Sequence, residues 1–414
     1  MKKKYVGLLA SMGVACVPAI ASAAGPTLSD VLVNSGIAAN GYVSASYNAT
    51  FNSTSGLPAG FPGPSVPLHA FDTSNNSFQL NQAALTLSYL PSSGVGALVN
   101  VIAGEDAKVI NSAYSNGSNS SDFALTQGYL QYAVGNLTVI GGRFVTLAGA
   151  EVIDDSKNTN ISRSLLFTNL EPLVHTGVRA SYKFDDMFTG IVGVNNSAFG
   201  YSSGMGKKPK TVEVGAAITP SSTVSIALAD YYGIDSPLGP QTKNNFADLV
   251  VSWQATSALQ FVLNGDYVRS IGSIDTTPGY ILSVADGESG GAFTGGSPEG
   301  SSSGAGGALY VNYQYNDHWK GSLRGEYLYL KATPTGGSIG SGIAHVAEAT
   351  ATIDYTAAKN FDLLGEFRGD YGSLSGGGNN IGVFPDGTNS VLFTQKSQME
   401  VLVKAIFKFG TPSS

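Results

Sequence analysis

The segment FDLLGEFRGDY, from Phe361 to Tyr371, alternates apolar and polar side chains without interruption. One set of alternate positions carries apolar or small residues, namely Phe361, Leu363, Gly365, Phe367, Gly369 and Tyr371. The other set includes the charged residues Asp362, Glu366, Arg368 and Asp370. Successive side chains of a β-strand point to opposite faces of the sheet. A period of two over this length therefore predicts a strand and not a helix.

The same alternation recurs in WKGSLRGEYLY, from Trp319 to Tyr329, and in the segment 343–355. Alternating segments of about ten residues, separated by turns, are typical of outer-membrane β-barrels. In a barrel the charged face lines the lumen and the apolar face meets lipid. In a soluble β-sandwich the charged face meets water and the apolar face meets a core. Periodicity alone leaves both folds open.

The composition favours the membrane barrel. Only 12% of the residues are charged, whereas an average soluble domain has about 25%. Tyr and Phe number 20 and 19 and gather near the ends of the alternating segments, as interfacial aromatic girdles require. Beyond the N-terminal segment the chain has no apolar run of the length that a transmembrane helix needs. A soluble β-sandwich or repeat protein is the alternative fold.

The N-terminus predicts export. Residues 1–23 begin with a basic MKKK, continue through an apolar run and end at Ala21-Ser22-Ala23, the pattern of a cleaved signal peptide. A lipoprotein signal ending at Cys16 is the rival interpretation. Removal of 1–23 leaves 19 basic against 29 acidic residues, a net charge of −10. An acidic exported chain is not expected to bind nucleic acid.

Short turn signals join the alternating segments in pairs. They lie at 91–93, 134–136, 185–186, 220–222, 255–257, 316–318 and 357–359. One strand precedes these seven hairpins, at about 37–51, and one follows them, at about 398–409. The sequence thus predicts an all-β fold, a transmembrane antiparallel up-and-down β-barrel of about 16 strands over residues 36–410. A short periplasmic segment at 24–35 and a tail at 411–414 flank it.

Bacterial barrels of this kind have short periplasmic turns and long external loops. Eight connections are predicted to be external. They span about 52–77, 105–121, 148–174, 199–210, 233–245, 272–304, 332–342 and 374–395. A 16-stranded barrel leaves an aqueous channel, so a channel that discriminates among solutes has to be narrowed by something inside it.

The segment Gly142 to Phe184, GRFVTLAGAEVIDDSKNTNISRSLLFTNLEPLVHTGVRASYKF, resembles the OmpL-like family of outer-membrane β-barrel porins. The likeness rests on a G-x-x-x-x-x-x-G-x-E stretch ending at Glu151, the run 160–167, the segment 172–175 and the strand HTGVR that starts at His175. It extends to the strand 41–47 and to the strand and turn rhythm of the rest. The resemblance implies a passive pore, and it brings no catalytic residue.

The third external loop, at 148–174, has the order and length of the loop that folds into the lumen of general porins. By that analogy we expect Glu151, Asp154 and Asp155 at a constriction. The bases expected opposite them are Arg143, Arg163 and Arg179. Acids facing bases across a narrow gap create a transverse field that filters dipolar solutes. A solvated surface loop is the alternative for this segment.

The inward faces of the strands are predicted to supply further lumen-lining charges. They are Lys183, Asp266, Lys320, Arg324, Glu326, Glu348, Asp362, Glu366, Arg368, Glu400 and Lys404. Both signs are present, so ion selectivity should be weak. The acidic net charge tilts the expectation toward cations.

Neither a metal nor a cofactor is predicted. The single cysteine lies in the signal peptide, and the four histidines, at 69, 175, 318 and 345, are scattered without a zinc-ligand spacing. No nucleophile motif is present, so an enzyme is not expected.

The sequence therefore predicts a Gram-negative outer-membrane porin for passive diffusion of small hydrophilic solutes and ions. Its expected partners are outer-membrane lipid and lipopolysaccharide, those solutes, and further copies of the chain in a homotrimer. The alternative is a plugged structural or adhesive barrel that acts through its external loops.

Overall fold

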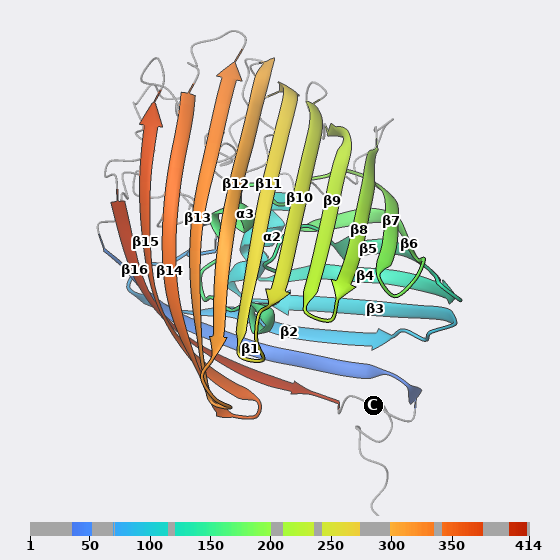
Figure 1. Cartoon of the computed structure of the whole chain (residues 1–414), viewed down its shortest axis with the longest axis horizontal. Coiled ribbons are helices and arrows are strands. Elements are labelled where there is room, and N and C mark those ends of the chain that lie inside the picture. Colours follow the sequence, from blue (N-terminus) through green and yellow to red (C-terminus); the bar gives the residue numbers. More distant parts are fainter. Residues whose placement is uncertain are drawn as a thin grey trace, which may run out of the picture.

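The computed structural model describes residues 35–51, 69, 71–114, 121–199, 210–235, 242–273, 299–334, 342–375 and 397–411. The predicted signal peptide, most of the segment 24–35, the tail beyond 411 and large parts of the predicted external loops lie outside these residues. Within them, 16 strands form one closed antiparallel barrel, in which β1 pairs with both β2 and β16 (Figure 1). The predicted fold class is confirmed.

The strands follow one another round the barrel in chain order. Their bounds are β1 Ala38–Phe51, β2 Ser77–Tyr89, β3 Gly94–Ala103, β4 Phe123–Val134, β5 Leu137–Val145, β6 Val174–Lys183, β7 Phe188–Asn195, β8 Thr211–Ser221, β9 Val224–Asp235, β10 Thr242–Gln254, β11 Leu259–Ser273, β12 Glu299–Gln314, β13 Trp319–Pro334, β14 Gly342–Ala358, β15 Phe361–Ser375 and β16 Ser397–Gly410. Each of the seven predicted short turns joins two consecutive strands. The alternation of side chains and the turn residues are both local sequence signals. They therefore located the strands correctly.

The alternation in β15 sorts side chains as expected. Phe367 and Tyr371 are exposed on the outer wall, whereas Glu366 and Arg368 are buried on the inner face. Exposed apolar residues recur on the outer face of every part of the wall, as a surface in contact with lipid requires.

The wall is not of uniform height. Strands β5, β6 and β7 have 9, 10 and 8 residues. Strands β12, β13 and β14 have 16, 16 and 17 residues. The barrel therefore has a short wall around β3–β7 and a tall wall around β10–β16, which Figure 1 shows as the long strands in yellow to red.

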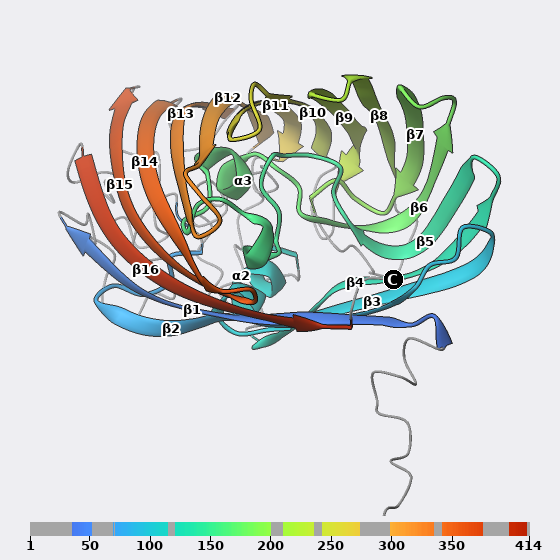
Figure 2. The same ribbon diagram turned by 60° about the horizontal axis from the view of Figure 1, so that its bottom comes forward.

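Three helical segments lie within the ring of strands (Figure 2). They are α2 Glu105–Tyr114, the 3₁₀-helix η1 Asp155–Lys157 and α3 Leu165–Asn169. The segment α2 begins with two acids, Glu105 and Asp106, which suit the positive end of a helix dipole. None of the described helices is long and apolar enough to cross a membrane.

Two apolar clusters lie inside the barrel, and the sequence did not predict them. One joins inward residues of β1–β4, β15 and β16 to α2 and the loop residues Ile153 and Phe167. The other joins α3 to the inward faces of β9–β14. A water-filled lumen was expected to have polar strand faces throughout. Parts of it are apolar because loop segments cover them and exclude water.

Candidate functional site

The third loop, residues 146–173, leaves β5 and returns to β6 across a closed base. The Thr146 amide donates to the Leu173 carbonyl at 3.0 Å. The loop then turns toward β9, where the Leu147 amide donates to the Tyr231 hydroxyl at 2.9 Å. Further along, the Ala150 amide donates to Asn264 Oδ1 of β11 at 2.8 Å. These contacts direct the loop into the lumen and not outward.

The departure of β5 from its neighbour β4 starts the loop on this path. Pairing of the two strands ends at Gly128 and Arg143. Gly142, just before, has φ +137°, and a Cβ there would lie 2.4 Å from the Gly128 carbonyl oxygen, so only glycine fits. Beyond the last pair, Arg143 Nη1 donates to the Leu125 carbonyl at 3.0 Å. Strand alternation puts Arg143 on the face opposite Phe144.

Arg143 thus does not have the predicted role of an inward base facing the loop acids. Its guanidinium lies on the other face of β5. It donates to the Leu125 carbonyl of β4, which lies beyond the last β4–β5 residue pair. The prediction failed because glycine-rich β5 (Gly141-Gly142) has little apolar contrast between its two faces.

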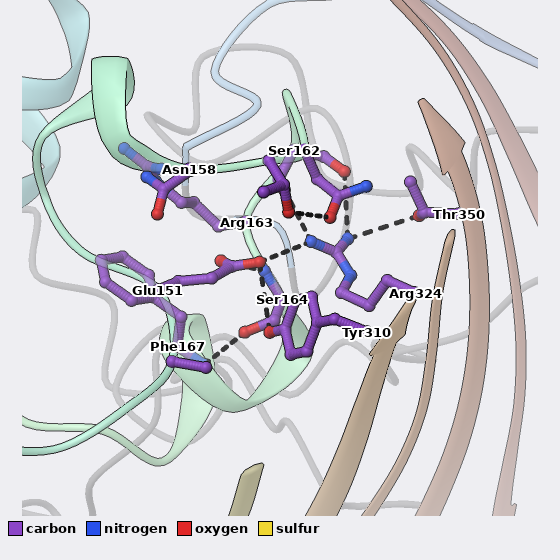
Figure 3. A network of polar contacts seen from close by, with 12 residues as sticks. Glu151, Asn158, Ser162, Arg163, Ser164, Phe167, Tyr310, Arg324 and Thr350 are labelled. Carbon is purple, nitrogen blue, oxygen red and sulfur yellow. Dashed lines mark hydrogen bonds and ion pairs between the residues drawn. The ribbon is translucent and has the colours of Figure 1, made fainter. Parts of the chain in front are cut away.

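Glu151 is buried and makes its ion pair with the tall wall (Figure 3). Its Oε1 lies 2.7 Å from Arg324 Nη1 of β13 and 3.3 Å from the Tyr310 hydroxyl of β12. Its Oε2 accepts from the Ser164 amide at 2.8 Å. The carboxylate therefore links two parts of the loop to two strands, and its partner is a base that the sequence assigned to the lumen lining.

Arg324 is the centre of this network. Its guanidinium lies 2.9 Å from Glu326 and 3.2 Å from Glu348, and it donates to the Ser162 carbonyl at 2.8 Å. The planar fork of arginine can serve several acceptors at fixed angles. One fully buried arginine thus holds both the backbone and an acid of the loop against the wall.

Asp155 and Arg163 form the second polar contact of the loop. They lie 2.6 Å apart, and Asp155 also accepts from Lys404 of β16 at 2.9 Å and from Ser44 of β1 at 2.7 Å. Burial raises the pKa of Asp155, but Lys404 and Arg163 outweigh that effect and hold it below its usual value. Burial lowers the pKa of Arg163, but the nearby acids, chiefly Asp155, outweigh that effect and raise this pKa above its usual value.

β15 contributes a third polar contact. The Glu366 carboxylate accepts from the amides of Ile161 and Ser162 at 2.6 and 2.9 Å. Arg368 donates to the Arg163 carbonyl at 2.7 Å. The two β15 side chains therefore bind loop backbone, which has no periodic sequence signal, so their role as anchors could not be predicted.

The short helix α3 docks through apolar contact. Its Leu166 and Leu170 are buried against β12, where the inward residues Gly304 and Gly306 leave space. A Cβ at Gly304 would lie 2.4 Å from Leu170 Cδ2, and one at Gly306 would lie 2.3 Å from Leu166 Cδ2. The sequence analysis missed this dock, although glycine at alternate inward positions of β12 is the signal that could have revealed it.

The remaining face of the loop is exposed and nearly neutral. Asp154 caps η1 by accepting from the Ser156 amide at 2.9 Å, and it lies 3.4 Å from Lys157. The Asp154 and Lys157 side chains are 31% and 70% exposed. Val152 beside them is also exposed. Of the three predicted constriction acids, only Asp154 is accessible, and it has its own counter-charge.

Arg179 lies on the inward face of β6, away from these acids. It pairs with Glu213 of β8 at 2.5 Å and donates to the Val145 carbonyl at 3.1 Å. Its guanidinium carbon lies 4.3 Å from the centre of the Phe144 ring, a cation–π contact. Arg179 therefore holds the main chain of Val145, the last residue of β5, where the loop begins.

The family comparison identifies the fold and the type of protein. The profile of the family described as "Putative beta-barrel porin-2, OmpL-like" matches residues 36–409. The chain belongs to this family. It is a protein of the bacterial outer membrane. None of the curated proteins matches the chain.

Solved structures share the fold at low sequence identity. A loop-deletion mutant of OmpT, an outer-membrane protein of Vibrio cholerae, is 10% identical with a TM-score of 0.55, over 90% of this chain and 99% of that one. The channel DcaP of Acinetobacter baumannii is 14% identical with a TM-score of 0.54, over 90% and 97%. An anion-selective porin from Comamonas acidovorans is 11% identical with a TM-score of 0.53, over 90% and 99%. At this level of identity, these similarities establish the barrel fold and nothing about function.

In this OmpL-like porin the predicted acids and bases do not face one another across a water-filled gap. Most of them form direct ion pairs. Of the six predicted constriction residues, Asp155 and Arg163 form a direct pair, while Glu151 pairs with Arg324 and Arg179 with Glu213. Buried charges are costly unless they are paired and hydrogen-bonded. That cost explains why the buried acids lie against bases and do not face them across water.

The predicted lumen-lining residues of the porin lie on inward strand faces. Those that are buried are Asp266, Arg324, Glu326, Glu348, Asp362, Glu366, Arg368, Glu400 and Lys404. Lys183 and Lys320, near the short turns, are more exposed and lie 2.7 Å from Asp186 and 3.0 Å from Asp354.

One histidine cluster has donor atoms close enough for a metal. Single atoms of His69, Asp72 and Glu400 lie within 4.8 Å of one another, and His69 Nε2 lies 3.2 Å from Asp370. Burial and Arg368 lower the pKa of His69, but Asp370 and Glu400 outweigh them and raise it well above its usual value. In this structure His69 is paired with Asp370 of β15 and with Glu400 of β16, so it connects its segment to both strands.

Proposed function

We propose that this porin forms a water-filled channel for passive diffusion of small hydrophilic solutes and ions. The path of the third loop supports it most. The anchors described above lie on β9, β11, β12, β13, β15, β16 and β1, and Gln82 of β2 adds a bond to the Ile153 carbonyl at 2.8 Å. A loop fastened to this one stretch of wall narrows a lumen and leaves room beside the opposite wall.

The opposite wall has the character that a solute path needs. Several inward residues of β3–β7 are polar, uncharged and partly exposed, in contrast to the buried inward charges of β12–β16. They include Asn100, Tyr129, Gln131, Thr138, Ser181 and Thr189. Hydroxyl and amide groups replace the water around a hydrophilic solute without binding it tightly. The proposed passage lies between these strands and the exposed loop residues Val152, Asp154 and Lys157.

We further propose a weak preference for cations. The inward bases of this wall, Arg179 and Lys183, are paired with Glu213 and Asp186, and Asp154 lies beside Lys157, so strong selectivity is not expected. Acidic side chains outnumber basic ones over the whole chain, 29 to 22, and their potential favours cations. The Comamonas porin, titled anion-selective, has the same fold, so selectivity depends on such side chains and not on the barrel.

Two kinds of partner follow from the outer wall. Its exposed apolar residues suit outer-membrane lipid, with lipopolysaccharide at the outer rim. The short strands β5–β7 are near the lower limit of about nine residues for a tilted transmembrane strand. We propose this short wall as the contact of a homotrimer, because neighbouring subunits there would shield it from lipid. One Vibrio OmpT structure, 11% identical with a TM-score of 0.54, is titled a trimer form.

Single-channel recording in a planar lipid bilayer tests the proposed channel. The folded protein should give ohmic steps, and under a KCl gradient the reversal potential should show a small excess of cation flux. Asp154→Asn should move the reversal potential toward anions. The matched variant Asp317→Asn, at the exposed short turn between β12 and β13, should leave it unchanged. Silence from a folded barrel would favour a plugged barrel that acts through its external loops.

A further inference from the structure

Three basic side chains lie close together on three strands of the tall wall. Arg269 of β11 and Lys331 of β13 are both register partners of Ser303, on the strand between them. Lys243 of β10 is the partner of Ile271, two residues after Arg269 on β11. Neighbouring strands are about 4.8 Å apart, so the main chains at Arg269 and Lys331 are separated by about 10 Å. Both long side chains can therefore reach one ligand.

These bases are on the outer face of the barrel. All three are exposed, whereas the residues next to them in the chain, Asn244, Ser270 and Leu330, are buried inside the barrel. Successive side chains of a strand point to opposite faces, so the bases point outward. They also lie at the ends of β10, β11 and β13 that meet the long connections, which is the external side of such a barrel.

The aromatic residues of the wall indicate the height of the bases. Trp319 at the short-turn end of β13 precedes Tyr329 by ten residues, and Tyr329 lies in one register row with Tyr267 of β11. Ten residues of a strand tilted by about 40° rise about 25 Å, the height of the apolar band between two aromatic girdles. The bases of β11 and β13 follow these tyrosines by two residues. They therefore lie just beyond the band, at the level of the lipid head groups.

No ion pair or hydrogen bond joins these three bases to the residues that the structure describes. The described outward side chains of β10–β13 include no acid, and the side chain of Glu299 at the start of β12 is not among them. Asp230 of the neighbouring β9 also faces outward, and it accepts from Asn245 at 3.1 Å. The inward bases, in contrast, are paired, as Arg324 is with Glu151. The outward charges are thus available to an anion from the surroundings.

We propose that Lys243, Arg269 and Lys331 bind the phosphate groups of lipopolysaccharide, whose acyl chains lie along the apolar wall beneath them. Phosphate suits the site, because arginine can bind it through two parallel hydrogen bonds and lysine adds a compact charge. The hydroxyl of Ser303, between Arg269 and Lys331, can donate a further bond.

The wall beneath the bases favours a lipid over a soluble phosphate. Leu263, Leu309 and Leu323, on β11, β12 and β13, are 48%, 47% and 56% exposed. A ligand with acyl chains and a phosphorylated head group matches both this apolar surface and the bases at its edge. Lipopolysaccharide is such a lipid, and it occupies the external leaflet. The inference rests on the lipopolysaccharide contact of the proposed function and assigns it to residues, but it does not require an open channel.

Binding of lipopolysaccharide to the folded full-length barrel in detergent tests the site. Deep-rough lipopolysaccharide with both lipid A phosphates is titrated in EDTA, so that divalent cations cannot bridge it to acids, and the complexes are counted by native mass spectrometry. Wild type should bind it saturably. Arg269→Gln combined with Lys331→Gln should weaken binding about tenfold or more. The matched variant Lys359→Gln, at the exposed turn between β14 and β15, should leave it unchanged.

Several results would overturn the assignment. They are a wild type without saturable binding, equal affinity in wild type and the double variant, and equal binding of dephosphorylated lipopolysaccharide or of phosphatidylglycerol. Displacement by an equal concentration of inorganic phosphate would also overturn it, because the site would then be one for a soluble anion. If the double variant does not fold, Lys243→Gln and the dephosphorylated lipid still decide the question.

The same proteins separate this site from the channel. The three bases face away from the lumen, so the double variant should keep the single-channel steps of wild type. A conducting barrel that does not bind lipopolysaccharide contradicts the lipid site alone. A silent barrel that binds lipopolysaccharide contradicts the channel alone.

Discussion

The third loop is held by two anchors of opposite chemistry. The polar anchor joins Glu151 and the backbone near Ser162 to Arg324 and Glu366, through ion pairs and charge-assisted hydrogen bonds. The apolar anchor places Leu166 and Leu170 over glycines of β12. The two lie next to each other in the sequence and on neighbouring strands of the tall wall. The two anchors differ in what each contributes.

The polar anchor mainly fixes the position of the loop and adds little net stability. A buried ion pair repays its desolvation only when its geometry is good, and its net contribution to stability is often small. The removal of one partner is nevertheless very costly, because a charge is left buried. Apolar burial stabilises without fixed angles, in proportion to the area removed from water. We infer that α3 holds the loop to the wall, while Arg324, Glu366 and Arg368 set its register.

The largest expected effect is that of Arg324→Met. It leaves Glu151, Glu326 and Glu348 without their shared cation, and it should cost about 3–5 kcal/mol of the free energy of unfolding. Heat-modifiability on gels and the unfolding temperature measure it. Lys320→Met, on the same strand, removes a base from an exposed pair with Asp354 and should cost at most about 1 kcal/mol. Equal effects of the two substitutions would contradict the polar anchor.

Next comes Leu166→Ala in the apolar anchor. Loss of a buried leucine side chain should cost about 2–5 kcal/mol, and the loosened loop should add brief closures to single-channel records. Because no charge is involved, this loss should be the same at low and high pH. Val152→Ala, at an exposed position of the loop, should leave stability and records near wild type. A charge-like pH dependence of the Leu166→Ala effect would count against separate anchors.

A smaller effect is expected from pH, through Asp106 of α2. Burial and then Asp155 raise its pKa to about 7. Between its ordinary pKa of 3.8 and 7 the folded protein keeps a proton that the unfolded chain has lost. The free energy of unfolding should therefore fall as pH rises through this range and level off above it. Asp106→Asn should remove this slope.

Asp155 should respond in the opposite sense, since its pKa is lowered in the folded protein. The stability that it contributes is present above its ordinary pKa of 3.8 and is lost as pH falls below that value. Denaturation measured from pH 3 to pH 9 in wild type and Asp106→Asn separates the two groups. An unchanged slope in Asp106→Asn would mean that another group titrates.

The smallest effect on stability is expected for Lys157→Ala, on the exposed face of the loop. An exposed ion pair contributes at most about 1 kcal/mol, so unfolding should hardly change. The freed Asp154 should, however, shift the reversal potential toward cations. Lys359→Ala, at the turn between β14 and β15, is the matched loss of one lysine. If both variants shift the potential equally, the exposed loop face does not line the passage.

The barrel itself could be predicted because its signals are local. Each strand shows its two faces in its own residues, as in Phe361–Tyr371, and each short turn lies between two such strands. The register of one strand on the next then follows from the pleat. The inward charges of β13–β16 were therefore recognisable as inward. Only in glycine-rich β5, where the faces look alike, was the orientation of a charged residue, Arg143, predicted wrongly.

The arrangement inside the barrel depends on contacts between distant residues. The sequence shows that Glu151 is acidic and that Arg324 is basic, but these residues are 173 positions apart and meet only because the loop crosses the lumen. That path depends on the bend at Gly142, on the space that Gly306 leaves for Leu166 and on bonds from wall side chains to loop backbone. None of these has a period. The sequence by itself thus determined the barrel and its two faces, whereas the tertiary structure decided which charges pair, because the partners come from distant parts of the chain and a buried charge is costly without one.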